Sequence, residues 1–119
     1  MTGYERLQVY LDGWRTGNAE QSLNATAPGF FYEDPNTGKI ERDEFLSFIE
    51  DFKSAVAEIR GGTIGTPFLR YTNTLISEER SLAWCWWQAT GTDFQGAAVI
   101  QFGDRGVISE KIAYFTELP

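Results

Sequence analysis

The sequence predicts an α+β fold in which three N-terminal helices pack on a curved antiparallel sheet and form a cone-like pocket. Apolar residues recur at helical spacing as far as Ile59, and four segments rich in β-branched and aromatic residues follow Gly62. Helices followed by a meander of strands is an order typical of α+β domains. The aromatic content of 15% suits a core and also the wall of an apolar pocket. Because 119 residues is an ordinary domain size, we expect residues 1–119 to form a single domain.

Three helices are expected from the spacing of apolar residues and from the residues that cap helix ends. The first is predicted over residues 4–16, with Gly17 as its C-terminal cap. Asn18 is expected to begin a short second helix, which Pro28 and Gly29 end. The third is predicted over residues 41–59, and its apolar side chains form one stripe: Phe45, Phe48, Ile49, Phe52 and Val56.

Extended segments account for the rest of the chain. A short one is expected at residues 30–33, before the strong turn signal of residues 34–38. Four long strands are predicted at residues 66–77, 82–90, 95–102 and 107–118.

The strand around Trp84 is apolar on both of its faces. Trp84 and Trp86 share one face, whereas Cys85 and Trp87 share the other. Both faces of the sheet are therefore expected to be covered, one by helices and the other by a second copy of the chain. A homodimer through the sheet is the predicted assembly.

Charge and composition make several classes of partner unfavourable. The net charge is −7 and no basic run is present, so neither nucleic acid nor an anionic membrane surface is an expected partner. No apolar stretch approaches the roughly 20 residues of a membrane-spanning helix. The first residues lack the pattern of a signal peptide, and Cys85 is the only cysteine. A reducing cytoplasm is therefore the expected location.

The absence of histidine limits the chemistry that the chain can perform. Histidine-dependent triads, histidine bases and the common zinc sites are not available, and one cysteine cannot build a thiolate site. We expect neither a metal nor a cofactor. Acid–base chemistry would have to use carboxylates, tyrosines, lysines or arginines.

Three strings in the sequence resemble the superfamily of nuclear transport factor 2-like proteins, ketosteroid isomerases and SnoaL-like polyketide cyclases. They are LQVYLDGWRTGN in the first helix, FFYEDPNTG after the second, and GAAVIQFGDRGVISEKIAYF at the end. Together they span nearly the whole chain. The resemblance implies a cystatin-like roll, but no single activity, because this fold hosts isomerases, dehydratases, cyclases, epoxide hydrolases and non-catalytic binders.

The resemblance to ketosteroid isomerases implies two catalytic residues. The base of those enzymes lies in a Glu-Asp-Pro turn, which matches Asp34, and their oxyanion-hole tyrosine matches Tyr10. Their second oxyanion donor, an acid on the penultimate long strand, corresponds here to Ala98. The acid that follows the last Tyr-Phe pair in SnoaL-like cyclases corresponds to Thr116. Each of these known chemistries therefore lacks one of its acids in this chain.

Two functions follow from the resemblance, both with a small apolar organic molecule in the pocket. The first is a cofactor-free isomerase, dehydratase or cyclase, with Asp34 as general base and Tyr10 polarising a carbonyl or alkoxide oxygen. The second is a non-catalytic dimeric module for ligand binding or interaction, in which Asp34 only caps its own turn and Tyr10 bonds within the core. The residues expected to line the pocket are Trp14, Phe31, Phe52, Trp87, Ala98, Ile100 and Phe115.

Overall fold

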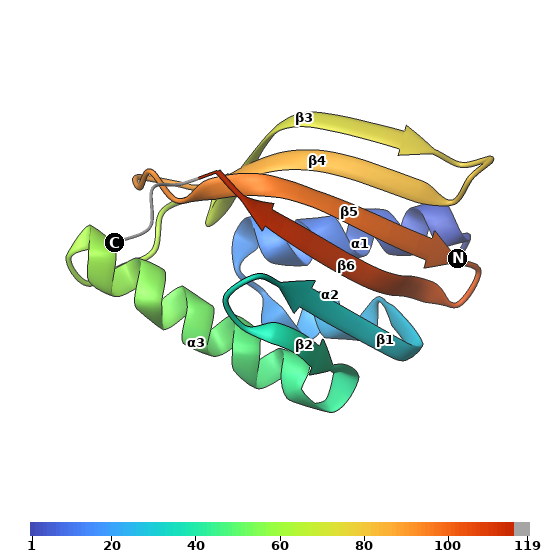
Figure 1. The fold of residues 1–119 in the computed structure, drawn as a ribbon, viewed down its shortest axis with the longest axis horizontal. Helices are drawn as coiled ribbons and strands as arrows, with labels where there is room; N and C mark the ends of the chain where they lie inside the picture. Colours follow the sequence, from blue (N-terminus) through green and yellow to red (C-terminus); the bar gives the residue numbers. More distant parts are fainter. Residues whose placement is uncertain (116–119) are drawn as a thin grey trace.

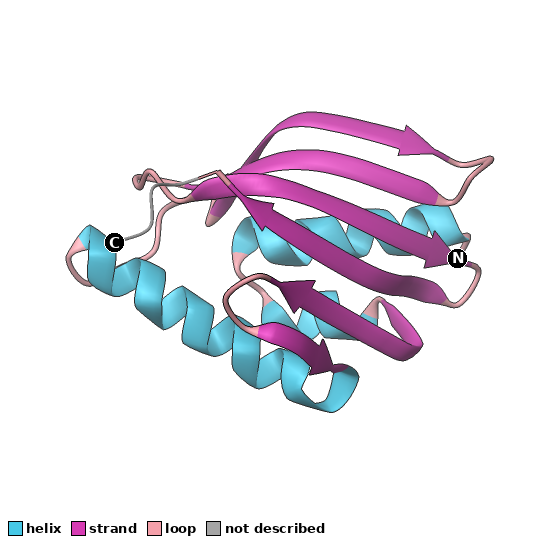
Figure 2. Cartoon of the chain, viewed as in Figure 1, coloured by secondary structure: helices cyan, strands magenta, loops and turns pink. Residues whose placement is uncertain are grey.

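A computed structural model describes residues 1–115 and shows three helices packed on one six-stranded sheet that does not close into a barrel (Figure 1). The predicted α+β class is confirmed, and Figure 2 shows the helices gathered against the sheet. Along the chain the elements are α1 (Gly3–Thr16), α2 (Ala19–Asn24), β1 (Thr26–Asp34), β2 (Gly38–Glu41), α3 (Arg42–Arg60), β3 (Leu69–Ser77), β4 (Leu82–Ala89), β5 (Gln95–Gly103) and β6 (Gly106–Tyr114).

The sheet is mixed, whereas the sequence predicted an antiparallel one. Its strand order is β2-β1-β6-β5-β4-β3, and every neighbouring pair is antiparallel except β1 and β6. The chain crosses through α3 from β2 at one edge to β3 at the other edge (Figure 1). The meander of β3 to β6 then returns to the middle of the sheet, where β6 runs in the same direction as β1.

The predicted caps Gly17 and Asn18 are confirmed, whereas the second helix already ends at Asn24 and not at Pro28 and Gly29. Thr2, which was not predicted, caps the start of α1. The Thr2 side chain accepts a hydrogen bond from the Glu5 backbone N–H, and the Glu5 carboxylate accepts one from the Thr2 N–H. Helix α1 ends at Gly17, whose φ of 82° is readily adopted only by glycine. The Asn18 side chain caps α2 by accepting from the Gln21 N–H.

The region between α2 and α3 holds more strand than the sequence predicted. Strand β1 begins at Thr26, and its register against β6 shifts between Thr26 and Phe31, so Pro28 and Gly29 lie in an irregular part of the strand. Strand β2 was not predicted, because four residues carry too little periodicity to be recognised. The last strand was predicted over residues 107–118, and the corresponding strand β6 ends at Tyr114. Residues 116–118 of that prediction lie outside the described residues.

An aromatic cluster fills the core between α1, α3 and β1. Phe45 of α3 is fully buried, and its ring centroid lies 4.7 Å from that of Phe30 and 6.2 Å from that of Tyr10. Trp14 of α1 and Tyr32 of β1 contact the same ring at centroid distances of 5.9 and 6.0 Å. This packing holds Tyr10, Trp14 and Tyr32 in place, and all three belong to the candidate site described below.

Candidate functional site

A narrow pocket opens between the helices and the inner face of the sheet. About 310 Å³ of empty space lies between its walls and in its open mouth, but only about 20 Å³ of this can hold the centre of a water molecule. Six of the nine lining side chains are aromatic, and one is a carboxylate. The nine residues are Trp14, Tyr32, Phe52, Leu69, Tyr71, Trp87, Glu110, Ile112 and Tyr114.

The alternation of strand β6 brings Glu110 into this wall. Successive side chains of a strand point to opposite faces, so Glu110, Ile112 and Tyr114 share the inner face. Lys111 and Ala113 lie on the outer face and are exposed. The carboxylate of Glu110 is therefore held at the pocket by the same pattern that buries its apolar neighbours.

Glu110 is a buried carboxyl group whose neighbouring donors are the Tyr10 hydroxyl and the Trp14 indole N–H. Only 4% of its surface is exposed, and the buried Tyr10 hydroxyl donates a hydrogen bond to its Oε1. Burial raises the pKa of Glu110 to about 7, and the hydrogen bond from Tyr10 and the nearby Trp14 indole N–H partly oppose that rise by favouring the charged form. At neutral pH the group is present in both protonation states, as an acid–base group requires.

Two buried indole groups in the pocket wall lack hydrogen-bond partners. The Nε1 atoms of Trp14 and Trp87 make no hydrogen bond of standard geometry to any residue in the described part of the chain. Buried indole N–H groups usually find an acceptor, and an unpaired one costs free energy. Both side chains line the pocket, but the Trp14 indole lies near the Glu110 carboxylate, so an oxygen atom of a ligand is a suitable acceptor for the Trp87 indole.

The carboxylate of Asp34 is occupied by hydrogen bonds from its own turn and from Tyr32. Its Oδ1 accepts hydrogen bonds from the backbone N–H groups of Asn36 at 2.8 Å and Thr37 at 2.6 Å, so it caps its own turn. Its Oδ2 accepts one from the Tyr32 hydroxyl at 2.9 Å. The carboxylate is buried beside the pocket but is not among its lining residues. Tyr10 bonds to Glu110, so the structure does not pair Tyr10 with Asp34.

Three of the predicted wall residues line the pocket, and two lie in the core. Trp14, Phe52 and Trp87 are lining residues. The face of β4 that carries Trp87 is thus the inner one, as the resemblance implied. Ala98 and Ile100 are buried on the inner face of β5 but do not line the pocket.

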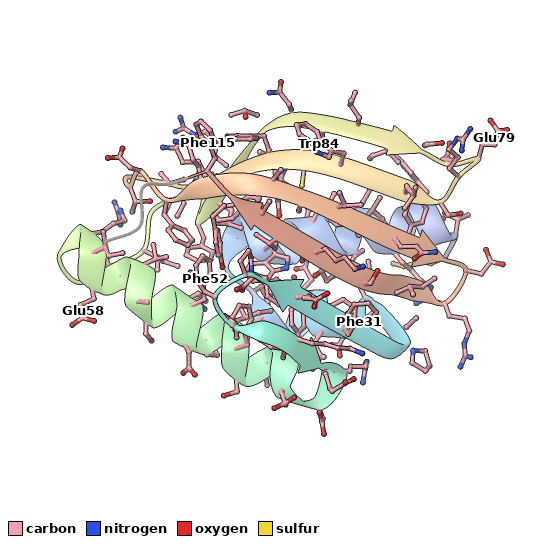
Figure 3. All side chains as sticks on the ribbon, in the orientation of Figure 1. Phe31, Phe52, Glu58, Glu79, Trp84 and Phe115 are labelled. Carbon is pink, nitrogen blue, oxygen red and sulfur yellow. The ribbon has the colours of Figure 1, made fainter. Side chains whose placement is uncertain are left out.

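Phe31 and Phe115 lie away from the pocket (Figure 3). On β1 the inward positions are Phe30 and Tyr32, so alternation turns Phe31 outward, with the Lys39 ammonium 4.6 Å from its ring centroid. Phe115 is 72% exposed and packs against Trp86 of the outer face, with 5.6 Å between ring centroids.

Four residues of the pocket wall were not predicted from the sequence: Glu110, Tyr32, Tyr71 and Tyr114. A signal for Glu110 was present, because Ile112 and Tyr114 share its parity and mark one face of the strand as apolar. A glutamate between Ser109 and Lys111 instead resembles an ordinary solvent-facing residue, since glutamate is rarely buried.

Two further findings apply to residues 1–115. None of their helices is long and apolar enough to cross a membrane. Their Cys, Asp and Glu side chains form no group of three that could hold a metal ion.

Replacing Tyr10 by phenylalanine is expected to raise the pKa of Glu110 further, because the lost hydrogen bond favours the ionised carboxylate. The free energy of unfolding at pH 8 should fall by about 2 kcal/mol, the usual range for a hydrogen bond to a charged group. Side-chain carboxyl NMR titration and urea unfolding measure the two effects. Tyr4→Phe, at a 38% exposed residue of the same helix, is the matched control. An unchanged Glu110 titration in Tyr10→Phe would contradict the assigned contact.

Comparisons with known proteins give a consistent answer at the level of the fold. Neither protein-family models nor curated proteins match the sequence. Solved structures match over nearly the whole chain. A SnoaL-like protein from Burkholderia thailandensis has a TM-score of 0.68 at 15% identity, covering 94% of this chain and 93% of that one.

Two more solved structures carry the other names of the superfamily. An NTF2-like protein from Cytophaga hutchinsonii has a TM-score of 0.65 at 9% identity, covering 96% of this chain and 90% of that one. A protein from Catenulispora acidiphila with a ketosteroid isomerase-like fold, in complex with trimethylamine, has a TM-score of 0.62 at 12% identity, covering 95% and 87%. The chain therefore has the nuclear transport factor 2-like fold that its sequence resemblance predicted.

Proposed function

We propose that this protein binds one small, mostly apolar organic molecule in the aromatic pocket and exchanges a proton with it through Glu110. One observation carries the proposal: Glu110 is the single carboxylate among the nine lining residues, and its pKa is near 7. An acid–base group works best when its pKa lies near the operating pH. An apolar pocket with a few placed polar groups is also the usual form of a small-molecule site.

The neighbouring side chains support this role for Glu110. Tyr10 orients the carboxylate from α1, and the aromatic rings exclude water around it. Asp34 acts indirectly, because it accepts the hydrogen bond that holds the Tyr32 hydroxyl at the pocket wall. In this proposal Glu110 is the acid–base group, in place of Asp34, for which the resemblance implied the role of general base.

The reaction class that suits these residues is cofactor-free proton transfer, as in an isomerase, dehydratase or cyclase. A binding module without catalysis is the second candidate. The narrowness of the pocket and the turn-capping contacts of Asp34 favour the second candidate. The trimethylamine complex of the Catenulispora acidiphila protein supports a small ligand for either one.

Calorimetry in two buffers of different ionisation enthalpy tests both parts of the proposal. Phenol, cyclohexanone and choline serve as probes, and binding of at least one should give a heat that depends on the buffer, because Glu110 gains or loses a proton. In Glu110→Gln the buffer dependence should vanish. Binding without buffer dependence in the wild type would favour the module. Ile112→Trp, which fills the pocket, should abolish binding, and retained affinity in that variant would refute the site.

We also propose that a second copy of the chain covers the outer face of the sheet. Leu75, Leu82 and Val99 are 70%, 39% and 47% exposed there, and with Trp84 they line a shallow apolar hollow across β3, β4 and β5. An apolar patch of this kind on one face suits a self-complementary two-fold contact. The cytoplasmic location expected from the sequence is a separate proposal.

Leu75→Arg combined with Val99→Arg is expected to convert the dimer to a monomer, because each dimer would bury four unpaired charges in an apolar contact. Light scattering of the wild type and the double variant measures the change. Ile59→Arg, at a 66% exposed position on α3, should leave the dimer intact. A monomeric wild type at about 100 μM, a concentration at which even a weak micromolar dimer would form, would contradict the proposed contact.

A further inference from the structure

Aromatic side chains from six elements line the pocket together with the carboxylate of Glu110. Trp14 comes from α1, Phe52 from α3, Tyr71 from β3 and Trp87 from β4. The other two aromatic residues are Tyr32 from β1 and Tyr114 from β6. The electron-rich faces of aromatic rings attract cations, most strongly those of tryptophan and tyrosine. Rings of this kind around an anionic group form a site for an organic cation.

We propose that the ligand class of this pocket is a small methylated amine, bound as its ammonium cation with Glu110 as the counter-ion. This inference rests on the proposed function and narrows it. Methyl groups suit the apolar wall, and the positive charge suits both the rings and the carboxylate. For a tertiary amine, the proton exchanged with Glu110 is the one that moves between its carboxyl oxygen and the amine nitrogen.

In the described part of the chain, no positively charged side chain forms an ion pair with the Glu110 carboxylate. Its titratable neighbours are Tyr10, Tyr32, Tyr71, Cys85 and Tyr114, and burial raises the pKa of each, so all five are neutral at pH 7. None of the ion pairs among residues 1–115 includes Glu110. An isolated buried carboxylate is costly, and a cation from outside would remove that cost. The net charge of −7 also attracts cations to the protein.

The size and the unpaired donor of the site narrow the choice of probe. The inner space is small, so the ligand must be small and part of it must lie in the open mouth. The indole N–H of Trp87 lacks an acceptor oxygen. Choline meets both conditions, because it has a trimethylammonium head and one hydroxyl group on a short chain.

The experiment compares choline with 3,3-dimethylbutan-1-ol, in which carbon replaces the charged nitrogen and the shape is kept. Calorimetric titration of the full chain at pH 8 should show choline binding at least about tenfold more tightly, the preference that a desolvated cation–π contact and an ion pair support. Glu110→Gln should reduce that preference, because only the cation–π part remains, and should keep the affinity for the neutral alcohol. Glu33→Gln, on the outer face of β1, changes the net charge equally and should retain the preference.

The pH dependence in the wild type gives a readout that needs no variant. Choline does not titrate, so its affinity should fall at least about tenfold between pH 8 and pH 5.5 as Glu110 takes up a proton, since the neutral acid no longer pairs with the cation. Equal affinities for choline and the alcohol, or a preference that Glu110→Gln leaves undiminished, would overturn the amine assignment and leave the pocket proposal standing. If phenol, cyclohexanone, choline and the alcohol all failed to bind, the proposed function itself would be refuted.

Discussion

Glu110→Gln is expected to stabilise the protein by about 3 kcal/mol at pH 8 and to leave its stability near pH 4 almost unchanged. In the unfolded chain the carboxyl titrates at its ordinary pKa of 4.5, whereas in the folded protein burial raises the pKa to about 7. Each pH unit between these values corresponds to 1.36 kcal/mol. Glutamine keeps an acceptor for the Tyr10 hydroxyl and removes the buried charge.

The sign of this effect follows from proton binding. Between pH 4.5 and 7 the folded protein holds a proton on Glu110 that the unfolded chain has lost, so the stability from this group is complete below pH 4.5 and is lost as pH rises through 7. Urea unfolding from pH 4 to pH 8 should show this loss in the wild type relative to Glu110→Gln. Glu33→Gln is the control with the same change in charge. Parallel pH profiles for wild type and Glu110→Gln would contradict the burial of an unpaired carboxyl group.

Phe45→Ala is expected to lower the free energy of unfolding by about 3–5 kcal/mol, the usual cost of removing a fully buried phenylalanine. The ring contacts Phe30, Tyr10, Trp14 and Tyr32, so the cavity left behind would adjoin side chains from α1 and β1 that cannot all move to fill it. Since a domain is stable by about 5–15 kcal/mol, a large part of its stability would be lost.

Urea unfolding at pH 7 measures the effect of Phe45→Ala. The matched control is Phe115→Ala, which removes the same ring from a 72% exposed position and should change the stability by about 0.5 kcal/mol or less. A similar loss in both variants would show that the ring of Phe45 is not the centre of the core.

Local signals in the sequence predicted much of the fold. Gly17 and Asn18 mark the boundary between α1 and α2 through their own backbone and side-chain preferences, so they could be recognised without tertiary contacts. The parallel pairing of β1 with β6 could not, because it joins residues about 80 positions apart and depends on the crossover through α3. Strand β2 is defined by its pairing with β1, and its four residues carry no periodic signal.

The candidate site was predicted only in part, for a related reason. Trp14, Phe52 and Trp87 are large apolar residues whose place in the wall follows from helix and strand periodicity or from the family resemblance. The importance of Glu110 comes from burial and from the Tyr10 hydroxyl, which lies 100 residues away in the sequence. The motif at Asp34 was correctly recognised as a turn, but the sequence does not show that the turn itself occupies the carboxylate.

The most direct test of this account is an NMR titration of the Glu110 side-chain carboxyl carbon in the wild-type protein. A midpoint near pH 7 is expected, because the group is buried among aromatic rings and its neighbouring donors are only the Tyr10 hydroxyl and, more weakly, the Trp14 indole. A midpoint near the ordinary value of 4.5 would contradict it. Such a result would mean that the carboxylate is solvated, and that the pocket does not hold the acid–base group on which the proposed function depends.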